Sequence, residues 1–199
     1  MSYMVFSQYT GDTSTFTRDM ELVRPKFEAQ GALRVTGSIV LTGETAGSFT
    51  VASIWNTADA YFDARPQVVG DPEVRAMMQS KGMAPLGTAF TELYGETGTP
   101  EGKYAVSVIA ASEGPNPEAE QAVVEAASNV METNGVNGMR FTRAIAAGQQ
   151  SGIYIAIAYT ESIDSYLAAS AAASTDSDFV SAMTNAKAQI VMRQFNLMD

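Results

Sequence analysis

One phrase occurs twice in this chain, and it limits the available folds more than any other feature. The stretch GSFTVASIWNTADAYFDA, residues 47–64, returns 105 residues later as GIYIAIAYTESIDSYLAA, residues 152–169. Further residues match at the same offset: Gly43 with Gly148, Asp59 with Asp164, Tyr61 with Tyr166, Asp71 with Asp176, Met78 with Met183 and Phe90 with Phe195. Near the start the offset shrinks to 101, where Tyr3 matches Tyr104. We therefore predict an internal duplication that gives two halves of one architecture.

Each half predicts the order β-α-β-β-α-β. In the first half, β-rich or alternating runs predict strands at 3–9, 33–43, 48–56 and 88–95. The helix expected over residues 12–30 contains Pro25, which removes a backbone donor and predicts a kink. Thr57 is expected to cap a short helix that runs through Phe62, and Pro72 to begin another helix.

The two halves meet at a segment with the composition of a linker, TGTPEG at residues 97–102. We therefore expect one repeat over residues 1–98 and a second repeat over 102–199. In the second repeat, the helix expected at YLAASAAASTD, residues 166–176, carries mostly small side chains. Such a helix suggests close backbone packing against a neighbouring element.

Two stretches carry a resemblance to a known superfamily: WNTADAYFDARPQVVGDPEVRAMM at 55–78 and, more loosely, TESIDSYLAASAAASTDSDFVSAM at 160–183. In each, a strand leads into a short helix, a loop and a cap for the next helix. In this the chain resembles the dimeric α/β-barrel superfamily, whose members are ferredoxin-like βαββαβ units. The resemblance implies an α+β fold in which two ferredoxin-like repeats form a pseudo-dimeric α/β barrel with antiparallel sheets.

The strands themselves agree with this expectation. In GIYIAIAY, residues 152–159, both alternating sets of side chains are uncharged, which indicates a sheet with apolar residues on both faces. Such a sheet needs a second sheet or a layer of helices over each face. A second sheet supplied by the second repeat would explain why the phrase recurs.

The composition excludes several kinds of chemistry. The chain contains no Cys and no His, so thiolate nucleophiles, Ser-His-Asp triads and His-ligated haem are excluded. Neither GxGxxG nor GxxxxGK[ST] occurs, and no EF-hand-like spacing of carboxylates is found. We therefore expect no metal and no organic cofactor.

Charge and the start of the chain point to partners and location. The net charge is −10, and such a surface repels phosphate backbones and anionic lipid. We expect a small-molecule ligand, and we expect neither nucleic acid nor a membrane as a partner. These expectations are compatible with a homo-oligomer. The start, MSYMVFSQYTGD, lacks the basic region and long apolar core of a secretory signal, which predicts a cytoplasmic protein.

Glu92 and Arg143 are charged residues that alternate with apolar neighbours on their expected strands. Leu197 occupies the position that matches Glu92, and Ser38 the position that matches Arg143. A buried charge needs a counter-charge, so the two can satisfy each other or a ligand, while exposure at a barrel rim is the alternative. A carboxylate between aromatic side chains would have a raised pKa suited to proton transfer, which makes Glu92 the candidate catalytic residue.

Aromatic residues at strand ends suggest a ligand pocket. Trp55 is the single tryptophan and is followed by Asn56, and Trp, Asn and Tyr around a pocket resemble the cofactor-independent monooxygenases of this superfamily, which act on phenolic or quinone-like substrates. We expect a pocket in the first half lined by Trp55, Tyr9 and Tyr94, with Asn56 and Arg143 as further binding residues. The alternative is that Trp55 simply fills the core or the rim.

Two functions from different classes follow. The first is binding of a small, largely apolar or aromatic metabolite, extending to a cofactor-independent monooxygenase-like enzyme. The second is a non-catalytic binding or assembly module that uses the barrel as a scaffold. The fold alone does not choose between them. An enclosed pocket with a paired ionisable group favours the enzyme, and a barrel filled by side chains favours the scaffold.

Overall fold

Eight strands close into a single barrel with helices on its outside. The computed structural model describes residues 2–199. Along the chain the elements are β1 (Ser2–Thr10), α1 (Phe16–Ala29), β2 (Arg34–Val40), β3 (Phe49–Trp55), α2 (Ala58–Gly70), α3 (Pro72–Ser80), β4 (Ala84–Gly98), β5 (Tyr104–Ala111), α4 (Pro117–Thr133), β6 (Gly138–Ala146), the 3-10 turn η1 (Gly148–Gln150), β7 (Tyr154–Thr160), α5 (Ile163–Thr175), α6 (Ser177–Asn185) and β8 (Gln189–Met198). Around the barrel the strands follow the order β1-β3-β2-β8-β5-β7-β6-β4, and the neighbouring pairs are antiparallel.

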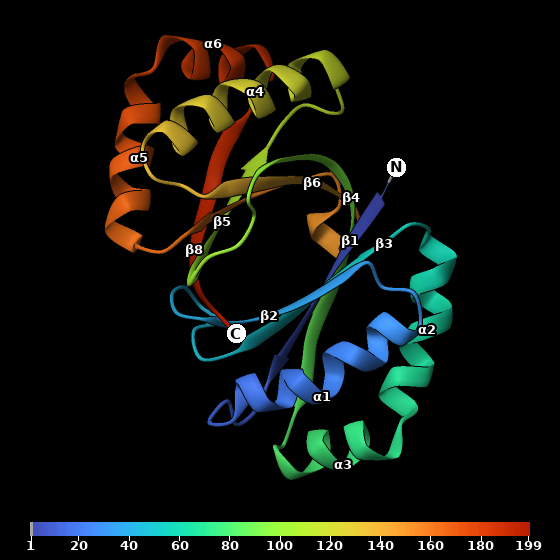
Figure 1. The fold of residues 1–199 in the computed structure, drawn as a ribbon. Coiled ribbons are helices and arrows are strands. Elements are labelled where there is room, and N and C mark those ends of the chain that lie inside the picture. Colours follow the sequence, from blue (N-terminus) through green and yellow to red (C-terminus); the bar gives the residue numbers. More distant parts are fainter. Residues whose placement is uncertain (1) are drawn as a thin grey trace.

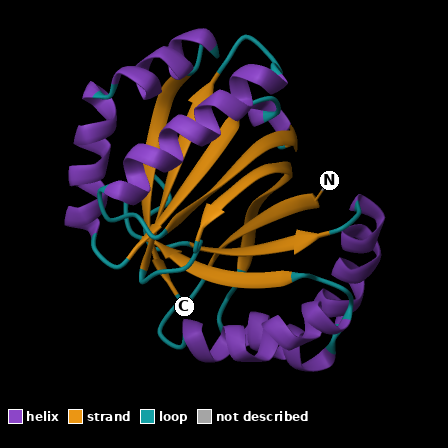
Figure 2. Ribbon diagram, turned by 45° about the horizontal axis from the view of Figure 1, so that its top comes forward, coloured by secondary structure: helices purple, strands orange, loops and turns teal. Residues whose placement is uncertain are grey.

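The barrel consists of two ferredoxin-like halves. In the first, the strands lie in the order β4-β1-β3-β2, and in the second in the equivalent order β8-β5-β7-β6. Pairing of β4 with β6 and of β2 with β8 joins the halves. Helices α1–α3 cover the first half and α4–α6 cover the second, on opposite sides of the barrel (Figures 1 and 2). The fold class expected from the sequence is thus confirmed.

The expected repeat boundaries fall between two strands. Strand β4 ends at Gly98 and β5 begins at Tyr104, so residues 99–102 of the segment expected as a linker connect the halves, whereas Thr97 and Gly98 belong to β4. Residue 1, with which the expected first repeat begins, lies outside the described residues. The boundaries 1–98 and 102–199, and the duplication itself, stay predictions.

Alternation along the strands divides the core into three clusters. One cluster mixes residues from both halves and therefore lies inside the barrel; it includes Met4, Ala52, Ile54, Ala105, Ile157 and Tyr159. The other two lie between each half of the sheet and its own helices. Both faces of the sheet are therefore covered, as the uncharged strands predict.

The helices begin largely where the sequence indicates. The Thr57 hydroxyl caps α2 by accepting from Ala60 N at 3.2 Å, and Asp71 caps α3 ahead of Pro72. Helix α2 nevertheless runs on to Gly70, well beyond its expected end. Helix α1 continues through Pro25, which lies on the exposed side, where water can satisfy the carbonyl that loses its donor.

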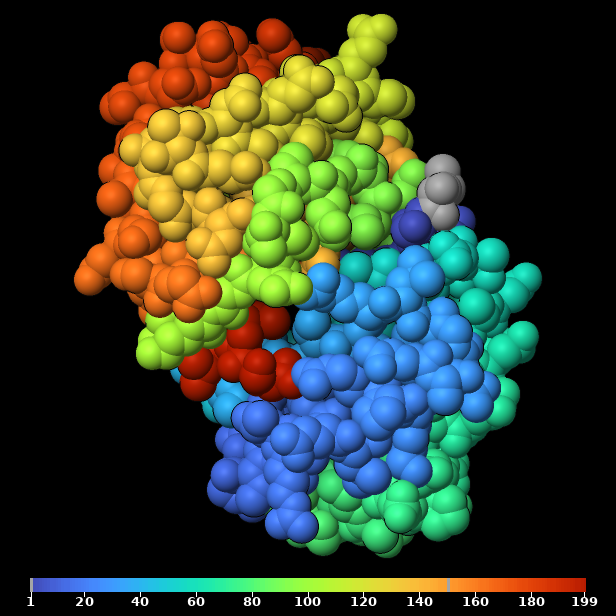
Figure 3. Space-filling view, in the orientation of Figure 1, coloured from blue at the N-terminus to red at the C-terminus, as the bar shows by residue number. Residues whose placement is uncertain are grey.

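The two joints between the halves differ in length. Strands β4 and β6 pair from Phe90 to Gly98, whereas β2 and β8 pair at only three positions, from Ser38 to Val40. At the shorter joint the Gly37 N–H donates to Asp199 Oδ1 at 2.8 Å, and the Asp199 carboxylate also forms an ion pair with Arg24. The red C-terminal residues accordingly lie against the blue residues of the first half in Figure 3.

None of the helices between residues 2 and 199 is long and apolar enough to cross a membrane.

Candidate functional site

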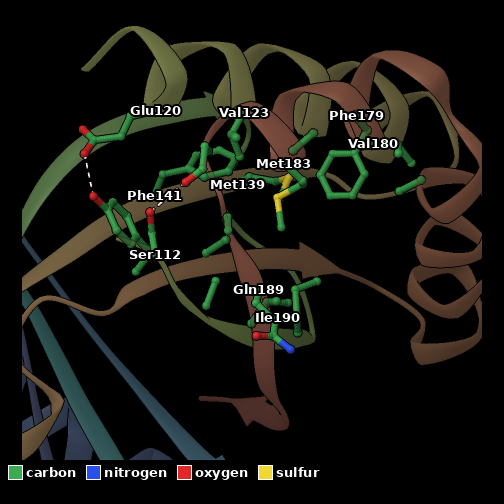
Figure 4. A pocket seen from close by; sticks show the side chains of 18 of the residues that line it. Ser112, Glu120, Val123, Met139, Phe141, Phe179, Val180, Met183, Gln189 and Ile190 are labelled. Carbon is green, nitrogen blue, oxygen red and sulfur yellow. Dashed lines mark hydrogen bonds between the residues drawn. The ribbon is translucent and has the colours of Figure 1, made fainter. Parts of the chain in front are cut away.

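The second half contains a cavity of about 520 Å³ between the outer face of its sheet and helices α4–α6 (Figure 4). Strands β5 to β8 form its floor. Most of its wall is apolar, including Val108, Ala127, Met131, Met139, Phe141, Ala156 and Phe179. Cavities of about 300–1,000 Å³ with apolar walls and a few polar groups are typical of small-molecule sites.

Small side chains create this space. Ala127 of α4, Ala156 of β7 and Ala173 of α5 all line the cavity. In the first half, Phe16 and Met20 of α1 fill the corresponding layer, and the cavity there measures only about 50 Å³. The same architecture is therefore packed in one half and hollow in the other.

A polar cluster closes one end of the cavity. The Tyr154 hydroxyl donates to Glu120 Oε1 at 2.8 Å, the hydrogen bond drawn to Glu120 in Figure 4. Arg143 donates through Nη1 to the same Glu120 oxygen at 2.9 Å and through Nη2 to Glu92 Oε2 at 2.6 Å. Two carboxylates thus share one guanidinium. Glu120 and Tyr154 line the cavity itself.

The position of Glu120 follows from the pattern of α4. Glu120, Val124, Ala127 and Met131 recur at helical spacing, so all four face the sheet. The helix starts at the Asn116 cap, whose side chain accepts from Ala119 N at 3.2 Å. A carboxylate on the apolar side of a helix needs partners, and Arg143 and Tyr154 supply them.

Burial keeps the aromatic hydroxyls at this end protonated. Burial raises the pKa of Tyr94, and the negative charge of Glu120 raises it further. Burial also raises the pKa of Tyr154, with a second contribution from its hydrogen bond to Glu120. The two rings meet edge to face, with centroids 6.2 Å apart. Two neutral hydroxyls and a carboxylate can therefore accept from and donate to a ligand, and can transfer a proton.

Two loops and an arginine form the rim of the cavity. The Ser112 hydroxyl donates to Ala186 O at 2.7 Å, and Lys187 forms an exposed ion pair with Glu113 at 2.5 Å, so the β5–α4 loop and the α6–β8 turn are linked. Arg193 of β8 also lines the cavity, and it forms no salt bridge with a carboxylate in residues 2–199.

The structure brings Glu92 and Arg143 together, one of the two arrangements expected. Their side chains are 14% and 22% exposed, which excludes the fully wetted rim position. Neither residue is part of the cavity wall, and Arg143 contacts it through Glu120 and Tyr154. The matching position of Arg143 is Ile39, since Arg143 lies opposite Tyr154 and Ile39 opposite Phe49. The gapless alignment with Ser38 is off by one residue, which would place the side chain on the other face.

The other expected site residues do not form one pocket. Trp55 is fully buried in the first-half core, where its Nε1–H donates to Ser53 Oγ at 2.8 Å. Asn56 is exposed in the turn that follows. Tyr9 lines the small cavity of the first half, whereas Tyr94 lines the large cavity of the second half. The shared first-half pocket is therefore not observed, because larger side chains fill that layer.

Sequence reasoning missed Glu120 and Tyr154. A readable signal exists, since Glu120 lies on the apolar stripe of its helix. The small-sided helix α5 was expected to pack closely against a neighbour. The helix does pack against α4, with Ala169 and Ala173 buried, and Ser170, Ala173 and Ser174 also border the cavity.

Among residues 2–199 no group of three or more Asp or Glu side chains is placed to hold an ion. Glu120 is the only carboxylate among the described residues that line the cavity.

Comparison with solved structures identifies the fold. Across its whole length the chain superposes on 91% of an anthrone oxidase-like protein (TM-score 0.60, 13% identity). It likewise covers 91% of a candidate monooxygenase from Fusobacterium nucleatum (TM-score 0.57, 15% identity) and 91% of a mutant chlorite dismutase from Candidatus Nitrospira defluvii (TM-score 0.61, 12% identity). The fold is that of a dimeric α/β barrel.

No protein-family model matches the chain, and no curated protein matches it. At identities of 9–15% the likeness to these structures concerns the fold. The dimeric α/β-barrel resemblance expected from the sequence is confirmed at that level.

Proposed function

We propose that this dimeric α/β-barrel chain binds a small, largely apolar or aromatic metabolite in the cavity of its second half. The observation that carries the proposal is the contrast between the halves, about 520 Å³ in one and about 50 Å³ in the other. An empty volume lowers stability, because its walls lose packing contacts. A cavity of this size with an ordered polar end is therefore best explained by a ligand.

Calorimetric titration with 4-hydroxybiphenyl tests this proposal. We expect one molecule to bind per chain. Ala156→Phe should abolish binding, because its ring would occupy the cavity. Val51→Ala is the matched control, since Val51 occupies the equivalent sheet position in the first half, and this variant should bind like wild type. Unchanged binding by the Ala156→Phe variant would contradict the proposal.

Material that co-purifies with the protein offers a second test. Mass spectrometry of an organic extract should show an apolar compound at near-stoichiometric amounts with wild type. The same compound should be missing from the Ala156→Phe variant. Equal amounts in both preparations would mean that the compound binds elsewhere.

A cofactor-independent monooxygenase-like activity is the second candidate. The Glu120–Arg143–Tyr154 cluster supports it, because a carboxylate at the end of an apolar cavity can take a proton from a bound phenol. Glu92 was predicted to handle the proton, and that role stays a prediction; Glu120 is the better-placed carboxylate. The alternative, a non-catalytic binding or assembly module, predicts binding without turnover.

Oxygen uptake distinguishes these two candidates. One structural neighbour is anthrone oxidase-like, so anthrone is a reasonable first substrate. Its oxidation by one O₂ would yield anthraquinone and water. An enzyme should consume oxygen with anthrone, and Glu120→Gln should lower the rate at least tenfold while retaining binding. Binding of anthrone without oxygen uptake would favour the non-catalytic module.

A further inference from the structure

The cavity has opposite charges at its two ends. At one end, Glu92 and Glu120 share the single guanidinium of Arg143, which leaves an excess of negative charge. At the other end Arg193 lines the wall without a carboxylate partner in the described chain. The wall between them is apolar.

Strand pairing fixes the separation of these ends. Arg193 lies opposite Val108, Val108 opposite Ala156, and Ala156 opposite Phe141, so Arg193 and Phe141 stand in one row across all four strands. Three strand spacings of about 4.8 Å separate them by about 14 Å along the sheet. Arg143 lies two residues beyond Phe141 on the same face of β6.

Each end has a definite preference for ligand groups. The Glu120 end offers carboxylate and hydroxyl oxygens and would repel an anion, so it suits a hydroxyl or another hydrogen-bond donor. Arg193 is exposed, which places it at the rim rather than inside the cavity. It also approaches Tyr166, whose pKa is raised by burial and lowered in part by Arg193. A guanidinium at that rim suits a carboxylate or similar acidic group.

We propose that the ligand is an elongated amphiphile that places a hydrogen-bond donor at Glu120, an apolar body between the helices and the sheet, and an acidic group at Arg193. This inference rests on the proposed function, because it names the class of molecule that the same cavity holds. It excludes both purely apolar compounds and compounds with acidic groups at each end as preferred ligands.

Four biphenyl probes test the inference by calorimetry at low ionic strength: biphenyl, 4-hydroxybiphenyl, biphenyl-4-carboxylate and 4′-hydroxybiphenyl-4-carboxylate. We expect the last to bind most tightly, with each polar group improving Kd about fivefold. Arg193→Gln should remove the advantage of the carboxylate and leave that of the hydroxyl. Glu120→Gln should do the reverse.

A matched variant controls for charge at the rim. Lys187→Gln also removes a cation from the cavity wall, but Glu113 already neutralises this lysine, so the carboxylate advantage should change less than twofold. Equal Kd values for 4-hydroxybiphenyl and 4′-hydroxybiphenyl-4-carboxylate would overturn the inference and leave the proposed function standing. Failure of all four probes to bind would overturn both.

Discussion

Arg143 and Glu92 face each other across the joint between β4 and β6, with Nη2 and Oε2 2.6 Å apart. Arg143 belongs to the second half of the barrel and Glu92 to the first. The same guanidinium holds Glu120 of the helix above. Burial alone would lower the pKa of Arg143, but its hydrogen bonds to Glu92 and Tyr154 and the nearby carboxylates raise it. One cation therefore connects both halves of the barrel with the end of the cavity.

Glu92→Gln should lower the free energy of unfolding by about 1–2 kcal/mol, because it removes a partly buried counter-charge. Urea denaturation measures this, with the exposed Glu21→Gln as a control that should change stability by less than about 0.5 kcal/mol. Binding of 4-hydroxybiphenyl should change little, since Glu92 does not line the cavity. If the variant keeps its stability but loses turnover, the predicted catalytic role of Glu92 is supported instead.

A matched pair of larger side chains tests the contrast between the halves. Val51→Phe should destabilise the protein by about 1–3 kcal/mol, because the cavity beside Val51 has a volume of only about 50 Å³ and a phenyl ring would overpack it. Ala156→Phe at the equivalent position should cost less than about 1 kcal/mol, because its ring enters existing space. Thermal denaturation compares the two. Equal losses would mean that the second-half cavity is not open in solution.

The fold could be predicted from the sequence because its signals are local and repeated. Alternation in residues 152–159 predicts a strand, the caps at Thr57 and Asp71 predict helix starts, and two copies of each agree. Two-sided apolar strands then require a covering layer on each face, which here is the opposite half of the barrel on one face and the helices on the other. These signals do not depend on which side chains meet across the molecule.

The site could not be predicted in the same way. A cavity is a difference between side-chain volumes from several elements, such as Ala127, Ala156 and Ala173, and each alanine alone is typical of ordinary packing. Trp55 and Tyr9 attract attention as large residues, yet large residues are what fill the first half. The position in the first half that matches Arg143 is Ile39, but a gapless alignment gives Ser38. Such an alignment does not detect a shift of one residue between the repeats.

Alkaline pH should weaken the folded state through its tyrosines. Burial raises the pKa of Tyr94 above its ordinary value of 10.0. Above pH 10 the unfolded chain therefore releases a proton that the folded chain keeps, so stability is full below pH 10 and falls as pH rises beyond it, by about 1.4 kcal/mol per pH unit for each such group. Tyr94→Phe should show a smaller fall in urea denaturation between pH 9 and 11. Parallel curves for both proteins would contradict this assignment.

The turn between α6 and β8 offers a final prediction. Lys187 has a φ of +48°, the left-handed region that glycine adopts without penalty, directly after the end of α6. Lys187→Gly should therefore raise the free energy of unfolding by about 0.5–1 kcal/mol, even though it removes the ion pair with Glu113, because that pair is exposed on both sides and contributes little. Lys187→Gln removes the same charge and keeps the backbone strain, so its stability should stay within about 0.5 kcal/mol of wild type. Urea denaturation of the three proteins checks the order of their stabilities. If Lys187→Gly instead lowers the free energy of unfolding, the ion pair between Lys187 and Glu113 contributes more to stability than relief of the backbone strain does.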